Sequence, residues 1–169
     1  MGMSKNIVYI EVNNKDGIVN NGIQIVEVKK TDLFQSLSVE ENKEILDIFM
    51  KNDFKFCNGC NLLITQPLFQ DKILPNEKSQ IKIYKKILDE YCKNEKVLIK
   101  NHPRESIKYD NYFSNAICLD KAFPLEILLL NKNIWFNKVI TISSTAIDMF
   151  ENCKEKIKLG WEWLDENTE

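Results

Sequence analysis

The sequence lacks the patterns that define several familiar protein classes. Its 169 residues include one histidine, five glycines and four prolines, and no apolar run approaches the roughly 20 residues of a membrane-spanning helix. The start of the chain has no apolar stretch typical of a secretory signal. The glycine patterns of a dinucleotide-binding loop and of a P-loop are also absent. We therefore expect a cytoplasmic protein that uses neither of these phosphate-binding loops.

Cysteine occurs in an odd number, five, on a chain without an export signal, which argues against a disulfide framework. Cys57 and Cys60 have the Cys-x-x-Cys spacing of a redox pair or of half a zinc site. A zinc site needs two further ligands at similar spacing, which the sequence does not offer. The Asn-Gly turn between the two cysteines leads into an expected strand, whereas redox motifs open a helix. We expect reduced thiols and no metal site, and we hold thiol redox chemistry only as a third hypothesis.

Composition and charge are those of an ordinary globular protein. Hydrophobic residues make up 44% and charged residues 28%, with a formal net charge of −2. This balance argues against a broad nucleic-acid-binding surface. The length suits one domain with a substantial core. The first three residues and the polar tail 163–169 lead us to expect that the natural protein is longer.

Short apolar runs alternate with amphipathic segments from residue 62 onward. The runs at 62–65, 97–99, 116–119 and 139–142 predict strands, and apolar residues at helical spacing predict a helix over 81–91. A second helix is expected to begin near Pro124 with Glu126 in its first turn, and the segment 157–163 is either a strand or a helix. This alternation predicts an α/β fold with a Rossmann-like parallel sheet flanked by helices on both faces.

Residues 1–55 follow a different pattern. The segments 7–12 and 23–28 are expected to be extended, either as a hairpin or as chain crossing from a missing region. Ser38 and the acidic residues after it predict the start of a helix that ends near Asn52. We therefore divide the chain into a linker or incomplete N-terminal segment, residues 1–55, and a Rossmann-like domain, residues 56–169.

Polar residues follow three of the expected strands where each one ends. Asp71 lies in the loop after the first strand, His102 opens the loop after the second, and Ser143, Ser144 and Thr145 follow the last. Because parallel strands place their carboxyl ends along one edge of a sheet, these residues can meet. A carboxylate, an imidazole beside cations, and hydroxyl groups with backbone N–H groups suit a ligand that carries phosphate.

Each of these residues also has a purely structural interpretation. A lone histidine such as His102 is more often a surface or hydrogen-bonded residue than a catalyst. Asp71 could belong to a turn, and Arg104 and Glu105 could form a weak surface ion pair. The hydroxyl residues 143–145 could only cap a helix, and Glu126 in a first turn needs no ligand to be stabilising. What favours a site is that all three strand ends carry suitable chemistry together.

Four segments carry a resemblance to a known family, in this order along the chain. They are Thr65-Gln66-Pro67, Lys100-Asn101-His102-Pro103-Arg104-Glu105, Phe123-Pro124-Leu125-Glu126 and Ser143-Ser144-Thr145. They resemble the motifs of the bacterial sialyltransferases of glycosyltransferase family 52, which build lipooligosaccharide or capsular sugars on a GT-B fold of two Rossmann-like halves. The resemblance covers roughly residues 62–150, and the His-Pro pair with the downstream hydroxyl residues is its most specific part. It implies that the chain is the C-terminal, donor-binding half of such an enzyme.

The resemblance also implies a reaction and roles for single residues. CMP-sialic acid would be the donor and a cell-surface glycan the acceptor, in an inverting transfer that needs no metal or cofactor. His102 would act as the acid toward the CMP phosphate, and Asp71 as the base toward the acceptor hydroxyl. The donor-binding residues would be Pro103, Arg104, Glu126, Ser143, Ser144 and Thr145.

Other properties stay open at this point. The resemblance is compatible with peripheral association of the full protein with the inner face of the bacterial membrane. A homodimer is compatible with the apolar surface that a missing half would leave bare. The alternative function is a nucleotide-binding or phosphosugar-binding Rossmann-like module without catalysis of its own.

Overall fold

We describe residues 7–12, 14–19, 22–49 and 58–168 of a computed structural model. The chain divides into two compact units, Met1–Glu44 and Ile45–Glu169. Three sequence predictions fall outside the described residues: the domain boundary at residue 55, the helix end near Asn52, and the pairing of Cys57 with Cys60.

Two short strands of the N-terminal unit, β1 (Tyr9–Val12) and β2 (Gln24–Glu27), pair in parallel, with Tyr9 opposite Gln24. The hairpin interpretation of this region is therefore wrong, because a hairpin requires antiparallel neighbours. A short helix, α1 (Lys30–Gln35), follows the second strand.

The next helix, α2 (Val39–Phe49), begins where the sequence predicted. The Ser38 hydroxyl accepts a hydrogen bond from the backbone N–H of Glu41 at 3.2 Å, and the Glu41 carboxylate accepts one from the Ser38 N–H at 2.8 Å. This reciprocal capping box satisfies two backbone donors at the helix start.

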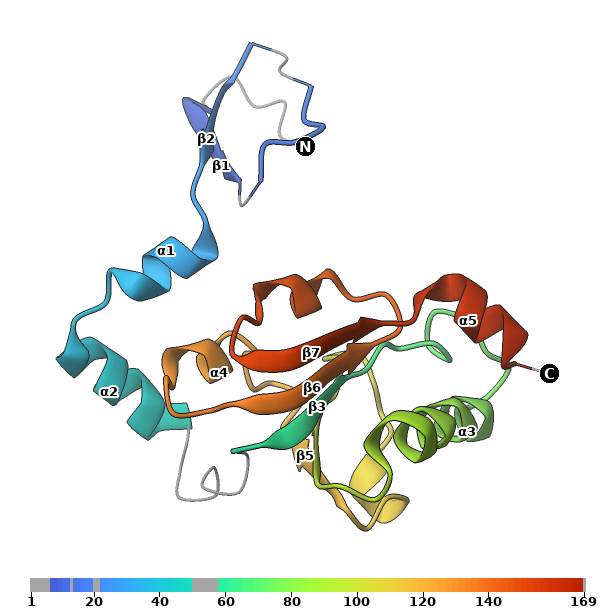
Figure 1. Ribbon diagram of the computed structural model, residues 1–169. Helices are drawn as coiled ribbons and strands as arrows, with labels where there is room; N and C mark the ends of the chain where they lie inside the picture. Colours follow the sequence, from blue (N-terminus) through green and yellow to red (C-terminus); the bar gives the residue numbers. More distant parts are fainter. Residues whose placement is uncertain (1–6, 13, 20–21, 50–57, 169) are drawn as a thin grey trace. The chain divides into compact units, whose positions relative to one another are not determined.

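The second unit contains a five-stranded parallel sheet in the order β5-β4-β3-β6-β7 (Figure 1). Its strands are β3 (Cys60–Ile64), β4 (Val97–Lys100), β5 (Ala116–Leu119), β6 (Phe136–Thr141) and β7 (Cys153–Lys158). The chain builds outward from β3 on one side and then returns to place β6 against the other side of β3. This is the Rossmann order, and its topological switch point lies between β3 and β6. The predicted α/β fold with a parallel sheet is confirmed.

The central strands form the core of this unit. Every residue of β3 and β4 is buried, as expected for strands with a covered surface on both sides. Leu63, Ile99 and Ile140 belong to one apolar cluster with Tyr84 and Leu164, which come from helices α3 (Glu77–Ile87) and α5 (Gly160–Glu166). Both helices therefore cover the same face of the sheet.

Within the five-stranded sheet, whose connections all lie in the described range 58–168, only the connection from β3 to β4 contains a long helix. In α3 the Asn76 side chain accepts a hydrogen bond from the Ser79 N–H at 2.9 Å, and the chain continues through the π-helical turn η2 (Leu88–Cys92). The later connections contain only short helices: η3 (Tyr109–Asn111), α4 (Ile127–Leu130) and η4 (Thr145–Met149). No helix within the described ranges is long and apolar enough to cross a membrane.

Two helix predictions need correction. The helix expected near Pro124 begins only at Ile127, because the preceding residues form a tight turn in which the Ile127 N–H donates to the Pro124 carbonyl at 3.1 Å. Glu126 therefore occupies the N-cap position of this helix and not its first turn. Its side chain makes no capping hydrogen bond. The segment 157–163 is both a strand end and a helix start, since β7 runs to Lys158 and α5 begins at Gly160, whose φ of +87° suits glycine.

Candidate active site

A pocket of about 610 Å³ lies at the carboxyl ends of β3, β4 and β6. It is lined by residues 64–67, Asp71, residues 100–104, residues 121–126 and residues 143–146. All eight residues singled out from the sequence are among them: Asp71, His102, Pro103, Arg104, Glu126, Ser143, Ser144 and Thr145. The fold thus brings together side chains separated by up to 74 positions, from Asp71 to Thr145. The position matches the general rule that open α/β sheets bind ligands beside the switch point.

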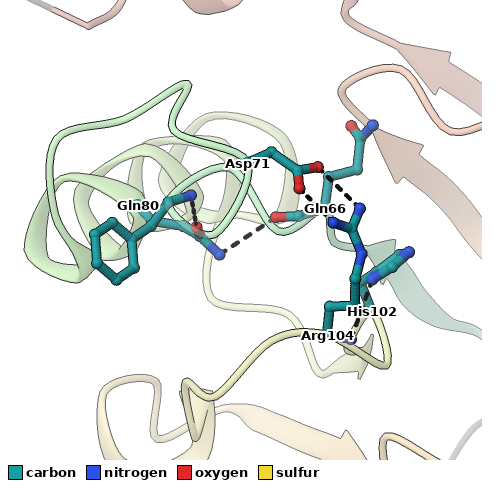
Figure 2. A network of polar contacts seen from close by, with 6 residues as sticks. Gln66, Asp71, Gln80, His102 and Arg104 are labelled. Atoms are coloured by element: carbon teal, nitrogen blue, oxygen red, sulfur yellow. Dashed lines mark hydrogen bonds and ion pairs between the residues drawn. The ribbon is translucent and has the colours of Figure 1, made fainter.

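His102 is half-buried at the end of β4, and its ring has a defined hydrogen bond. Nδ1 accepts the backbone N–H of Arg104 at 3.2 Å (Figure 2). Burial lowers the pKa of His102, the neighbouring Arg104 and Lys100 charges lower it further, and Asp71 opposes them. Since Nδ1 is an acceptor, the neutral ring carries its proton on Nε2. The imidazole can therefore donate a hydrogen bond from Nε2 while it is uncharged.

Asp71 is held by Arg104 across the pocket. The two guanidinium nitrogens of Arg104 lie 2.5 and 3.0 Å from the two carboxylate oxygens of Asp71 (Figure 2). The side chains are 33% exposed for Asp71 and 61% exposed for Arg104, so the pair contributes little to stability. Asp71 is also a turn residue, because its N–H donates to the Pro67 carbonyl at 2.8 Å. The ion pair joins the loop after β3 to the loop after β4.

Glu105 is buried beneath the His-Pro loop, with only 3% of its surface exposed. Its carboxylate accepts hydrogen bonds from the His102 N–H at 2.6 Å, the Gln80 amide at 2.6 Å, the Tyr109 hydroxyl at 2.8 Å and the Thr65 hydroxyl. Burial raises the pKa of Glu105, and the hydrogen bonds from Thr65, Tyr109 and His102 oppose that shift. The carboxylate therefore fixes the backbone N–H of His102 from the protein interior.

The interpretation of Arg104 and Glu105 as a surface ion pair is wrong. Arg104 pairs with Asp71, and Glu105 faces the protein interior. Sequence reasoning missed the role of Glu105 because a charged loop residue is ordinarily exposed. The one available signal was the nearby Tyr109, a donor four residues further on.

Gln66 connects the ends of β3 and β6. Its Nε2 donates to the Ser143 hydroxyl oxygen at 2.7 Å, and its Oε1 accepts the Ser143 N–H at 2.8 Å. The next residue, Ser144, caps η4, because its hydroxyl oxygen accepts the Ala146 N–H at 3.2 Å. The capping interpretation thus holds for Ser144, which lines the pocket at the same time. Each hydroxyl oxygen is an acceptor within the protein and retains its own proton for another partner.

Lys100 supports another wall of the pocket. Its ammonium group donates to the carbonyl of Asn101 at 2.7 Å and to that of Lys121 at 3.0 Å, which ties the segment 121–126 to the end of β4. Burial lowers the pKa of Lys100, and the charges of Asp120, Glu105 and Glu126 oppose the shift. An ammonium has three N–H donors, so one remains beyond these two carbonyl contacts.

Among the described residues, no group of three or more His, Cys, Asp or Glu side chains is arranged to hold a metal ion. The described cysteines, Cys60, Cys92, Cys118 and Cys153, form no disulfide with one another. Burial raises the pKa of both Cys92 and Cys118 to about 11. These two thiols lack the low pKa of reactive cysteines.

Comparison with known proteins identifies the family of the chain. The family profile of glycosyltransferase family 52 matches residues 1–159. The chain belongs to glycosyltransferase family 52. An uncharacterized protein of Haemophilus influenzae is 35% identical over 162 residues, which cover 92% of this chain and 51% of that relative. The family 52 chain thus spans about half the length of the curated relative that it matches, and no solved structure matches it.

Proposed function

We propose that the chain forms the donor-binding part of an inverting sialyltransferase that transfers sialic acid from CMP-sialic acid to a cell-surface glycan. The observation that carries this proposal is the gathering of Asp71, His102 and the two serines in one pocket beside the switch point. Membership of glycosyltransferase family 52 supports the transfer of a sugar. The order of motifs along the chain, which resembles that of the bacterial sialyltransferases, supports sialic acid as the sugar.

The phosphate of the donor would lie against the hydroxyl groups of Ser143 and Ser144, with Thr145 beside them. Both serine hydroxyls keep a proton that no protein acceptor takes in the contacts described above. Hydroxyl protons of this kind match the acceptor-rich oxygens of a phosphate. Pro103 and Arg104 would complete the donor contacts from the His-Pro loop, and Glu126 would accept hydrogen bonds from the ribose or cytosine.

His102 would assist departure of CMP. Bond cleavage leaves negative charge on the phosphate oxygen and an oxocarbenium-like sugar, so a proton donor at that oxygen lowers the barrier. The acceptor role of Nδ1 leaves Nε2–H as the donor of the neutral ring. The neutral imidazole would donate a hydrogen bond from Nε2 to the leaving oxygen. Transfer of a proton to that oxygen would require the imidazolium, which becomes neutral imidazole in the step and which a bound phosphate favours.

Asp71 would accept the proton of the acceptor hydroxyl on the opposite face of the sugar, as inversion requires. A carboxylate has about four lone-pair sites, and the two contacts with Arg104 use two of them. The remaining lone pairs are open to a hydroxyl group. Arg104 would keep the carboxylate oriented toward the pocket.

The test is product formation by the full-length protein from CMP-sialic acid and a galactose-terminated acceptor, with His102→Ala and the matched control Lys82→Ala. Lys82 is exposed on α3 and does not line the pocket. We expect His102→Ala to lower kcat on the order of 100-fold or more, and Lys82→Ala to leave it unchanged. Near-normal turnover by the His102 variant would contradict the proposed mechanism.

The second candidate function is a nucleotide-binding module without chemistry of its own. It rests on the same pocket, whose hydroxyl groups at the strand ends suit a phosphate. Both functions require CMP binding, which calorimetry measures. Only the transferase forms a sialylated product, so product formation distinguishes the two functions. Binding without product supports the module, whereas absence of CMP binding overturns both.

A further inference from the structure

Gln66 belongs to the Thr65-Gln66-Pro67 motif, and the proposed reaction gives it no task. It lies two residues beyond the end of β3, and Ser143 lies two residues beyond the end of β6. These strands are neighbours at the switch point. The Gln66 amide and Ser143 exchange two hydrogen bonds, at 2.7 and 2.8 Å, across the floor of the pocket.

The chemistry of the pair allows only one orientation. A backbone N–H can only donate, so the oxygen of the Gln66 amide must face the Ser143 N–H. The amide NH₂ group then faces the Ser143 hydroxyl, whose oxygen must accept. The hydroxyl proton is thereby directed away from Gln66 and stays available to a ligand in the pocket.

The backbone of Gln66 is itself held firmly. Its N–H donates to the hydroxyl of the fully buried Tyr84 at 2.6 Å, and its carbonyl accepts from that hydroxyl at 3.1 Å. The carbonyl also accepts from the Gln80 amide at 3.3 Å (Figure 2). The amide group of Gln66 therefore projects from a fixed point of the core.

We infer that Gln66 is a positioning residue, which fixes the Ser143 hydroxyl as a hydrogen-bond donor to a phosphate oxygen of the nucleotide in this pocket. The inference rests on the proposed function, because it assumes an anionic phosphate beside Ser143. A donor that is already oriented loses no rotational freedom when the ligand binds. Glutamate at this position would have the opposite effect, since its carboxylate would accept the hydroxyl proton and repel an anion.

The test is a double-mutant cycle on CMP affinity, measured by calorimetry on the 169-residue chain. The variants are Gln66→Ala, Ser143→Ala and the two combined. A further variant, Gln66→Glu, replaces the neutral amide by a carboxylate, which would accept the Ser143 hydroxyl proton. Gln70→Ala is the matched control, because Gln70 lies in the same loop but does not line the pocket. Thermal unfolding of every variant reports on the fold independently of the ligand.

We expect Gln66→Ala to weaken CMP binding on the order of tenfold when Ser143 is present and hardly at all in the Ser143→Ala background. Gln66→Glu should weaken it further, and Gln70→Ala should have no effect. An equal loss in both backgrounds would overturn the inference, because Gln66 would then act without Ser143.

Inorganic phosphate separates this inference from the proposed function. If CMP does not bind but phosphate binds with the same dependence on both residues, the nucleotide assignment fails and the role of Gln66 stands. If neither CMP nor phosphate binds, both are overturned.

Discussion

Arg104 donates two hydrogen bonds from its guanidinium group to the carboxylate of Asp71, at 2.5 and 3.0 Å. The backbone N–H of Arg104 donates to Nδ1 of His102 at 3.2 Å. One residue thus contacts both proposed catalytic groups. Loss of its side chain removes the Asp71 contact, whereas the contact to His102 belongs to the main chain. The two contacts can therefore be tested separately.

Substitution of Asp71 should affect catalysis far more than folding. We expect Asp71→Asn to lower kcat about 100-fold or more, because an amide cannot take the acceptor proton. The free energy of unfolding should change by less than about 1 kcal/mol, since the ion pair with Arg104 is largely exposed. Initial rates and urea denaturation measure the two effects. Similar losses of rate in Asp71→Asn and in the exposed-loop control Lys72→Ala would contradict the role of base.

The pKa of His102 should lie below the ordinary value of about 6.5 in the free protein and rise when CMP binds. Burial and the charges of Arg104 and Lys100 disfavour the imidazolium, and a bound phosphate favours it. The C2 proton of this single histidine provides an unambiguous NMR titration. Arg104→Ala should raise the midpoint in the free protein. If CMP leaves the titration midpoint of His102 unchanged, the phosphate does not bind next to the imidazole.

The same shift has a consequence for stability. The unfolded chain binds a proton at His102 before the folded protein does, so stability falls as pH drops from about 6.5 through the lowered folded pKa. The difference in free energy of unfolding between wild type and His102→Gln isolates this contribution. We expect the wild type to lose stability relative to the variant across that window. A constant difference would mean that the histidine titrates alike in both states.

Glu105 should be needed for the fold of the His-Pro loop. Glu105→Ala leaves the donors of Thr65, Gln80, His102 and Tyr109 without their shared acceptor, and we expect a loss of about 3 kcal/mol or more. Glu105→Gln keeps the shape and should cost less. Because burial raises the folded pKa of Glu105, the stability of the wild type relative to Glu105→Gln should fall as pH rises from about 4.3 through that raised pKa. Chemical denaturation at several pH values measures both effects, and equal costs for the two variants would contradict the network.

Cys92 should resist thiol reagents in the folded protein. It is fully buried, and burial raises its pKa to about 11, so almost no thiolate is present at pH 8. Mass spectrometry after brief iodoacetamide treatment should find Cys92 unmodified, and modified once denaturant is added. Rapid labelling of the folded chain would show that the α3 side of the sheet opens readily.

The parts of the fold that were predicted correctly depend on local patterns. The strands β3 and β4 contain the short apolar runs 62–64 and 97–99, and the capping box of Ser38 and Glu41 spans only four consecutive residues. The gathering of Asp71, His102 and Ser143 followed from the rule for parallel strand ends alone. What could be predicted was therefore the neighbourhood of these residues and not their contacts.

The contacts that were missed depend on distant partners. Two of the donors that bind the buried Glu105 carboxylate come from positions 65 and 80, and the pattern around residue 105 does not predict them. Gln66 and Ser143 are 77 positions apart, and only the return of the chain to β6 makes them neighbours. The short length of α4 depends on the tight turn at Pro124, which the expected helix start did not anticipate.

The walls of the pocket differ in how they are anchored. His102, Ser143 and Gln66 each lie two residues beyond the end of a sheet strand, whereas Asp71 lies seven residues beyond β3. The side chain of Asp71 contacts the loop after β4 through its exposed ion pair with Arg104. Asp71 lines the pocket, Leu74 is buried in the core cluster and Asn76 caps α3, whereas Lys72 and Ile73 are exposed and without such a role. Substitutions that reshape this side of the pocket without disturbing the core can therefore be placed at these two positions, next to Asp71.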